Sequence, residues 1–175
     1  MKQILVLISF VAFAGCKINT QKLQISAIQT VPKRVAKENP ETGTTYTFTS
    51  RNEITERLAP QIFMLSKTAE TLQFRIQGNI HSSGHSMSRV RKIRFEKREQ
   101  YGNTITLRYF VEIKKIPGKE NADVRGYNYT KDETYKIPND VKLIQIELYE
   151  DRLNDTSIIN PALIAQHIFN FFAKI

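Results

Sequence analysis

A chain of 175 residues with 41% hydrophobic and 25% charged residues can bury the core of one folded domain, and this composition excludes a disordered chain and two sizeable domains. Lysine and arginine outnumber aspartate and glutamate by 26 to 17, a net charge of +9 that favours an anionic partner. The single cysteine excludes an intramolecular disulfide.

The N-terminus has the pattern of an export signal. Lys2 supplies a positive start, an apolar run covers residues 4–14 with Ser9 as its one polar member, and Gly15 follows. Because a membrane-spanning helix needs about 20 apolar residues, this run is too short to remain in a bilayer as one. We therefore predict that residues 1–15 are a cleaved signal peptide.

The signal ends in Phe13-Ala14-Gly15-Cys16, which resembles the lipobox of bacterial lipoproteins, with phenylalanine where leucine is usual. The resemblance implies cleavage before Cys16, a diacylglycerol on its sulfur and a further acyl chain on the new amino terminus, and two or more chains anchor a protein stably. The alternative is an ordinary secretory signal followed by an incidental cysteine. We interpret residues 16–22 as the acylated cysteine and a tether, and residues 23–175 as one β-rich domain.

The residues after the cysteine favour an outer-membrane location. No aspartate of the kind that keeps lipoproteins in the inner membrane follows Cys16, since Ile18 and its neighbours are neutral or basic, and no acidic run of the surface-export kind follows. We expect the domain on the periplasmic face of the outer membrane.

Without residues 1–15 the chain has 25 basic and 17 acidic residues, a net charge of +8. Export excludes nucleic acid as the partner of this charge and leaves lipid head groups, an anionic glycan or an acidic protein surface.

Hydrophobic residues recur with the period of two that is typical of strands with one buried face. The clearest segment is 104–114, and with 90–97 it predicts a hairpin that turns at residues 101–103. Val90 is out of phase with Ile93, which indicates a bulge near Arg91 and Lys92. The other expected strands are 23–28, 44–49, 62–65, 72–80, 127–130, 135–137 and 141–149. About eight short strands predict a mainly β fold, an antiparallel β-sandwich or alternatively a small barrel.

One helix is expected, over residues 161–174. Asn160 is a suitable N-cap, Pro161 suits the first turn, and apolar residues at helical spacing follow. Its 14 residues are too few to cross a membrane. We expect it to lie against the sheets, with a partner-binding or membrane-lying helix as the alternative.

Basic residues crowd the strand 90–97 and its approach. The candidates for binding an anion or an acidic partner are Arg75, Arg89, Arg91, Lys92, Arg94 and Arg108, with Lys97 and Arg98 nearby. The competing interpretation is a solvated sheet face, or an edge strand whose charges prevent aggregation.

His81 and His85, beside three serines, are the nearest approach to a catalytic or metal site. Gly84 and the serines favour a loop, and a zinc site needs a third or fourth ligand from elsewhere in the chain. We predict no metal, no cofactor and no set of catalytic residues.

These patterns predict a lipid-anchored, non-enzymatic binding or assembly component for an envelope protein or an anionic glycan. Two further functions stay open. An envelope hydrolase or metal-dependent enzyme would use His81 and His85 and needs a distant acid or histidine beside their rings. A carrier of an apolar ligand in a small barrel needs an enclosed apolar cavity.

Overall fold

The computed structural model describes residues 22–82, 86–119, 123–156 and 159–171. Over these ranges the chain is mainly β and contains no helix, so none of the described residues belongs to a helix that could cross a membrane. The predicted signal peptide, Cys16 and His85 lie outside the described residues. The strands are β1 (Gln24–Glu38), β2 (Thr45–Glu53), β3 (Gln61–Lys67), β4 (Thr71–His81), β5 (Ser86–Tyr101), β6 (Thr104–Pro117), β7 (Val124–Lys136), β8 (Leu143–Arg152) and β9 (Ala162–Asn170).

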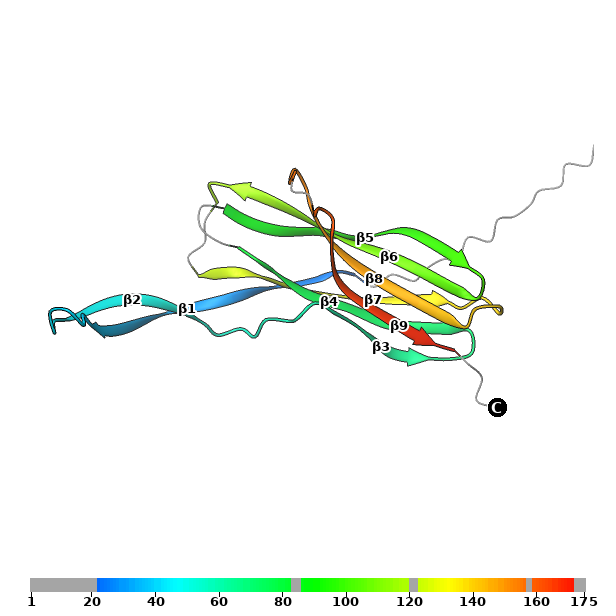
Figure 1. Cartoon of the computed structure of the whole chain (residues 1–175), viewed down its shortest axis with the longest axis horizontal. Helices are drawn as coiled ribbons and strands as arrows, with labels where there is room; N and C mark the ends of the chain where they lie inside the picture. The colour runs from blue at the N-terminus through cyan, green and yellow to red at the C-terminus, as the bar shows by residue number, and fades with distance from the viewer. Residues whose placement is uncertain (1–21, 83–85, 120–122, 157–158, 172–175) are drawn as a thin grey trace, which may run out of the picture.

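The strands form two sheets (Figure 1). The first has the order β2-β1-β7-β4-β3 and is antiparallel throughout, and the second has the order β5-β6-β8-β9. β6 and β8 are parallel, which departs from the antiparallel arrangement expected from the sequence. Parallel neighbours require a crossover, and here the chain makes it by passing through β7 in the other sheet.

One hydrophobic core joins the two sheets. The period-two patterns are confirmed, because alternate residues of β4, β6 and β8 are fully buried. The β5–β6 hairpin is also confirmed, with Tyr101 opposite Thr104 and a register shift between Val90 and Lys92. Core residues with no exposed surface include Leu72, Phe74, Ile76, Ile105, Leu107, Tyr109, Ile144, Ile146 and Leu148.

The predicted C-terminal helix over residues 161–174 is wrong. Its described part is β9, which pairs antiparallel with β8 from Leu143 opposite Asn170 to Glu150 opposite Ala162. Strand pairing prevails because an isolated helix of a dozen residues is marginal in water, whereas β9 satisfies the backbone groups along the edge of β8.

Two local features explain why the segment resembled a helix. A register shift beside Leu148 places one extra residue in β9, so its apolar residues do not follow a strict period of two. Asn160, the expected N-cap, instead fastens the preceding loop to β8. Its side chain accepts a hydrogen bond from the Arg152 amide and donates one to the Arg152 carbonyl, both at 2.9 Å.

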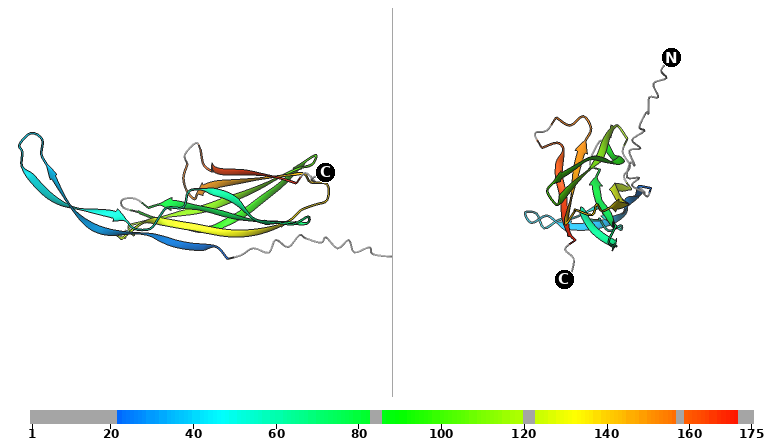
Figure 2. Two further views of the ribbon diagram at one scale, coloured as in Figure 1. Left: turned by 90° about the horizontal axis from the view of Figure 1, so that it is seen from below. Right: turned by 90° about the vertical axis from the view of Figure 1, so that its right-hand side faces the viewer.

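β1 and β2 extend beyond the rest of their sheet. β1 pairs with β7 as far as Gln29, and from Thr30 to Glu38 it pairs with β2 alone. We call residues 30–53 the arm. The body is the rest of the two sheets, including residues 24–29 of β1. Figure 2 shows the arm as a curved ribbon that leaves one end of the body. The expected strands 23–28 and 44–49 cover only part of β1 and β2.

A buried ion pair lies between β7 and β5. Lys131 Nζ is 2.6 Å from Glu133 Oε1, and the two side chains are only 12% and 1% exposed. Lys131 Nζ also donates to the Ile93 carbonyl at 3.3 Å, which connects the two sheets. Burial raises the pKa of Glu133, and Lys131 opposes that shift. The charged form of Glu133 is therefore costly to bury, and Lys131 offsets part of that cost.

Replacing Lys131 with Met leaves the Glu133 carboxylate buried without its cation, and we expect the free energy of unfolding at pH 7.5 to fall by roughly 3 kcal/mol. A carboxyl whose pKa is raised by folding binds its proton more tightly in the folded chain. Its contribution therefore favours folding at low pH and is lost as the pH rises through the folded-state pKa. The effect of Lys131→Met, measured by urea denaturation, should be smaller at pH 5 than at pH 7.5.

The double variant Lys131→Met/Glu133→Leu is the control, because it removes both charges and keeps the volume. It should recover most of the lost stability. Equal losses at the two pH values, or a double variant as unstable as the single one, would contradict a buried, mutually dependent pair.

Candidate functional site

Arg94 is the centre of an ion-pair network on β5, β6 and β8. Its guanidinium lies 2.9 Å from Glu112, 3.0 Å from Glu96 and 3.5 Å from Asp151. Lys92 Nζ approaches the same Glu112 carboxylate at 3.4 Å. Burial acts to lower the pKa of Arg94, but the hydrogen bonds to Glu112 and Glu96 raise it overall. Carboxylates of the same sheet thus balance the charges of two residues predicted to bind an anion.

Arg108 forms a second group of contacts on the same sheet. Its guanidinium lies 2.9 Å from Glu147 on β8 and 3.1 Å from Glu99 on β5. Glu147 also accepts hydrogen bonds from the Gln145 amide at 2.6 Å and the Tyr149 hydroxyl at 2.9 Å. Burial acts to raise the pKa of Glu147, but these bonds and the one from Arg108 lower it overall. Arg108 is therefore bound within the sheet as well.

Arg75 lies in the other sheet, so the structure does not bring it together with the remaining candidates. Opposite it on β7, Asp132 accepts two hydrogen bonds from the guanidinium, at 2.6 and 2.8 Å. This bidentate contact lowers the pKa of Asp132. Arg75 thus joins β4 to β7 within its own sheet and is not part of the basic cluster on β5.

Arg89 and Arg91 are the most open members of the predicted set. Both side chains are exposed on β5, and no ion pair joins either of them to another described residue. The anion-binding interpretation stays a prediction, but four of its six cations already have carboxylate partners within the body.

His81 lies at the end of β4 beside a cation. Its Nδ1 is 3.2 Å from the Arg57 guanidinium, which also forms an ion pair with Glu53. The hydrogen bonds from Arg57 lower the pKa of Glu53. Among the described ranges of the chain, no three histidine, cysteine or acidic side chains are grouped as a metal ion would require. An arginine against the ring is an unfavourable neighbour for a bound metal.

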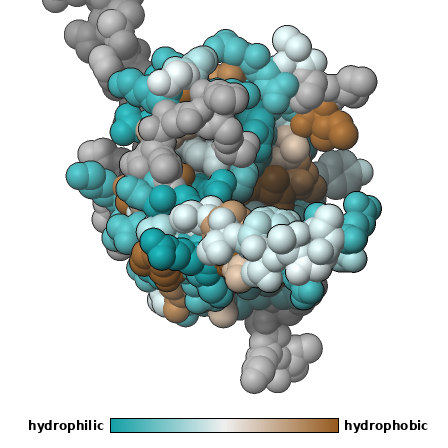
Figure 3. Space-filling model, turned by 90° about the vertical axis from the view of Figure 1, so that its left-hand side faces the viewer, coloured by the Kyte–Doolittle hydropathy of each residue, from teal (hydrophilic) through white to brown (hydrophobic). Residues whose placement is uncertain are grey.

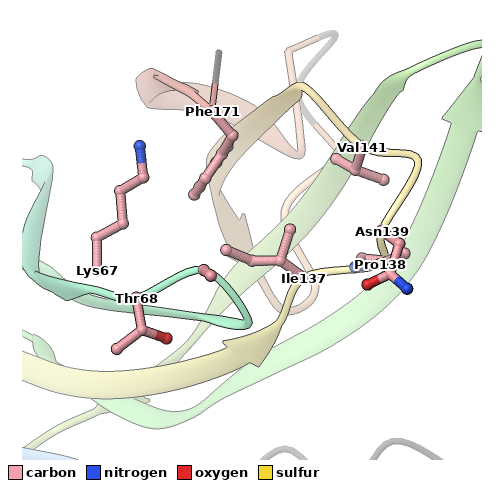
Figure 4. Close-up of a pocket in the computed structure, with 8 residues that line it drawn as sticks. Lys67, Thr68, Ile137, Pro138, Asn139, Val141 and Phe171 are labelled. Atoms are coloured by element: carbon pink, nitrogen blue, oxygen red, sulfur yellow. The ribbon is translucent and has the colours of Figure 1, made fainter. Parts of the chain in front are cut away.

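Among the hollows at the surface of the described residues, one lies beside His81 and another lies beside the C-terminal strand. The first, of about 630 Å³, has His81, Lys115 and Arg152 among its lining residues. The second, of about 530 Å³, lies between the β3–β4 turn, the 137–141 loop and Phe171 (Figure 4). There Lys67 Nζ stands 4.4 Å from the centre of the Phe171 ring and donates to the Asn170 carbonyl at 2.8 Å. That lysine is already engaged by the C-terminal strand, so the hollow offers little free polar chemistry.

The arm contributes no residue to the hydrophobic core cluster of the described structure. Three of its large hydrophobic side chains are exposed, Val31 by 40%, Tyr46 by 48% and Phe48 by 42%. Val35 lies opposite Phe48, and the Tyr46 and Phe48 rings are 6.1 Å apart, so one face of the arm carries a small apolar stripe. Seen from the arm's end, hydrophobic surface forms separate patches among hydrophilic residues (Figure 3).

The base of the arm is fixed to the body. The Thr30 amide donates to the Asp123 carbonyl at 2.9 Å, and the Ile54 amide donates to the Gln29 carbonyl at 3.0 Å. Arg51 donates to the Thr30 hydroxyl at 3.0 Å and pairs with Asp123. The direction in which the arm leaves the body is therefore defined by hydrogen bonds on both strands.

Comparison of the chain with protein-family models, curated protein sequences and solved structures gives no match. Function is therefore inferred from the geometry of this chain.

The arm was not predicted, although the sequence contains a signal for it. Valine and lysine take turns at every second position of residues 31–37, namely Val31, Lys33, Val35 and Lys37. The turn sequence Asn39-Pro40-Glu41-Thr42-Gly43 then lies between two β-prone stretches. This combination predicts a long hairpin. The projection of this hairpin from the body depends on where β1 stops pairing with β7, which the sequence pattern does not show.

Replacing Glu112 with Gln removes the carboxylate that Lys92 and Arg94 share, so Lys92 becomes available to an external anion and Arg94 keeps only Glu96 and Asp151 as partners. We expect binding to a sulfated polysaccharide such as heparin to strengthen by about 1 kcal/mol, roughly fivefold in Kd, at low salt. Isothermal titration in 50 mM NaCl would measure it.

The matched control is Glu41→Gln at the tip of the arm, which changes the net charge equally but lies away from the cluster. It should leave the affinity almost unchanged. The same increase in both variants would mean that overall charge, rather than the release of Lys92, governs binding.

Proposed function

We propose that this chain is a lipid-anchored protein of the bacterial envelope, on the periplasmic face of the outer membrane, that serves as a non-enzymatic assembly component. In this proposal Cys16 carries the acyl chains, residues 16–22 are the tether, and the body is a β-sandwich. The arm is the part that contacts a protein partner. The observation that carries the proposal is the projecting arm with its exposed apolar stripe.

The arm's composition favours a contact role over a purely structural one. A two-stranded ribbon is marginally stable in water unless another surface covers it. Tyr46 and Phe48 contribute little to the core of the body, since neither belongs to its cluster of buried residues. Exposed tyrosine and phenylalanine are enriched at protein interfaces, because a rigid ring buries much area at a low entropic cost.

The dimensions also suit a component that bridges from a membrane to a partner. A seven-residue tether spans at most about 25 Å when extended. Nine paired residues in each strand of the arm extend for about 30 Å. A body held close to the bilayer could thus reach a partner well beyond its own surface.

A protein partner is better supported than an anionic glycan. The cations predicted to bind a glycan are largely paired with carboxylates, Arg94 with Glu112 and Arg108 with Glu147. Desolvating such pairs for an external ligand costs free energy that open lysines would not require.

An enzyme and a carrier of an apolar ligand have less support than an assembly component. A metal-dependent or hydrolytic site at His81 would have the Arg57 guanidinium against the ring. A carrier of an apolar ligand would need room between the sheets, where packed side chains such as Phe74, Tyr109 and Leu148 lie.

Photo-crosslinking from the arm tests the proposal. With p-benzoylphenylalanine at Tyr46 of the full chain, we expect irradiation of intact cells to give a discrete protein adduct, because this side chain lies in the proposed contact. The same amino acid at Tyr101, a 91% exposed position at the end of β5 in the body, is the matched control and should give at least tenfold less adduct. Immunoblotting measures both.

The variant Cys16→Ala tests the anchor in the same cells. It should move the chain from the membrane fraction to the soluble envelope fraction and reduce the Tyr46 adduct. Unchanged membrane retention would contradict the lipid anchor, and equal adducts from Tyr46 and Tyr101 would contradict a role for the arm.

A further inference from the structure

The two edges of the arm differ in which backbone groups they present. Asn39 donates to the Thr44 carbonyl and Ile54 to the Gln29 carbonyl, so odd-numbered residues of β1 form the hydrogen-bonded pairs with even-numbered residues of β2. Hydrogen-bonded and non-hydrogen-bonded pairs alternate along an antiparallel ladder. The Thr30 amide agrees with this phase, because it points away from β2 to Asp123.

It follows that β2 presents an open edge of backbone donors and acceptors. The outward-facing amides and carbonyls belong to Thr45, Thr47, Thr49, Arg51 and Glu53. From Thr45 to Ser50 the strand has no charge, no proline and a high content of threonine and aromatic residues. Such an edge favours the addition of another strand.

The opposite edge of the arm is protected. On β1 the outward positions are the even-numbered ones, and Pro32 occupies one of them, where it has no amide hydrogen to donate. Arg34 and Glu38 place charges along the same edge, a further means by which proteins prevent unwanted strand pairing. One edge of the arm is thus blocked and the other is open.

We propose that the open edge of β2 pairs antiparallel with β2 of a second copy of this chain, centred near Phe48, to form a four-stranded ribbon β1-β2-β2-β1. This inference rests on the proposed function, because it names the partner that the arm contacts. It is an interface between identical edges about a twofold axis, the commonest symmetry of homo-oligomers.

The sequence of β2 is complementary to itself in this arrangement. With Phe48 opposite the same residue of the second copy, Tyr46 lies opposite Ser50, Thr47 opposite Thr49, and Arg51 opposite the neutral Thr45. No charge faces a like charge, and the aromatic and threonine pairs stabilise adjacent strands. The two outer strands of the ribbon are then both β1, whose outer edges carry Pro32. A strand from a different protein would instead add an outer edge of its own.

The net positive charge of the chain is compatible with this pairing. Antiparallel arms place the two bodies at opposite ends of the ribbon, about 30 Å apart, and salt screens charge beyond about 8 Å at physiological ionic strength. Strands of nine residues bury less surface than a standard stable interface, so the dimer should be weak in dilute solution. Confinement on a membrane raises the effective concentration and favours it.

Disulfide crosslinking of the full chain in its membrane tests the inference. Phe48→Cys places two thiols at a non-hydrogen-bonded pair, where Cα atoms about 4.5 Å apart permit a disulfide. Ala36→Cys, exposed on β1 of the same arm, is the matched control. After mild oxidation we expect at least ten times more disulfide-linked dimer from Phe48→Cys, and none from the unmodified chain, whose Cys16 is acylated.

A second change separates edge pairing from random collision. In the Phe48→Cys background, Thr47→Pro removes an outward amide without breaking a bond to β1, whereas Thr47→Ala keeps that amide. Thr47→Pro should lower the dimer yield at least tenfold and Thr47→Ala should not, with the melting temperature of the body unchanged in both. A charge on the edge, Thr49→Lys, should act like Thr47→Pro.

The inference is overturned if Ala36→Cys crosslinks as well as Phe48→Cys, if Phe48→Cys gives no dimer, or if neither Thr47→Pro nor Thr49→Lys reduces the dimer. The photo-adduct at Tyr46 then separates the two proposals. An adduct with the mass of one chain plus a different protein would leave the proposed function standing without the second copy. No adduct at Tyr46 would remove both.

Discussion

β1 changes its partner half-way along its length, and the shape of the molecule depends on that change. Up to Gln29 it pairs with β7 in the body, and from Thr30 onward it has only β2 beside it. Backbone hydrogen bonds at Asp123 and Gln29 fix the point of divergence. A strand that continues past its sheet must satisfy its backbone in a two-stranded ribbon, which is why the chain folds back through the turn at Gly43.

The body supplies the rigidity that such a projection requires. Its two sheets share a core of fully buried aliphatic and aromatic side chains, and the Lys131–Glu133 pair connects them beside β5. On the outer face of β5, β6 and β8, carboxylates balance the arginines across strands. Four of the six basic residues predicted to bind an anion therefore join neighbouring strands, whereas the arm carries an exposed apolar stripe.

Local patterns in the sequence predicted the elements whose structure depends on near neighbours. The alternation over residues 104–114, the hairpin with residues 90–97 and the bulge beside Val90 were all correct, because turn chemistry and side-chain period determine them. The C-terminal helix was wrong, because pairing with β8 outweighs the local preference of residues 161–171. The ion-pair network could not be foreseen, since β6 and β8 are brought together by a crossover through the other sheet.

Amide hydrogen exchange resolved to single residues in the arm of the full chain is the most direct test of its open edge. In dilute detergent solution, the amides of Tyr46, Phe48 and Ser50 should be protected by their bonds to β1. Those of Thr45, Thr47 and Thr49 should exchange quickly. The latter three should become protected in the membrane, where the arms pair. Protection of all six amides in dilute solution, or of none, would show that β2 does not offer an open edge.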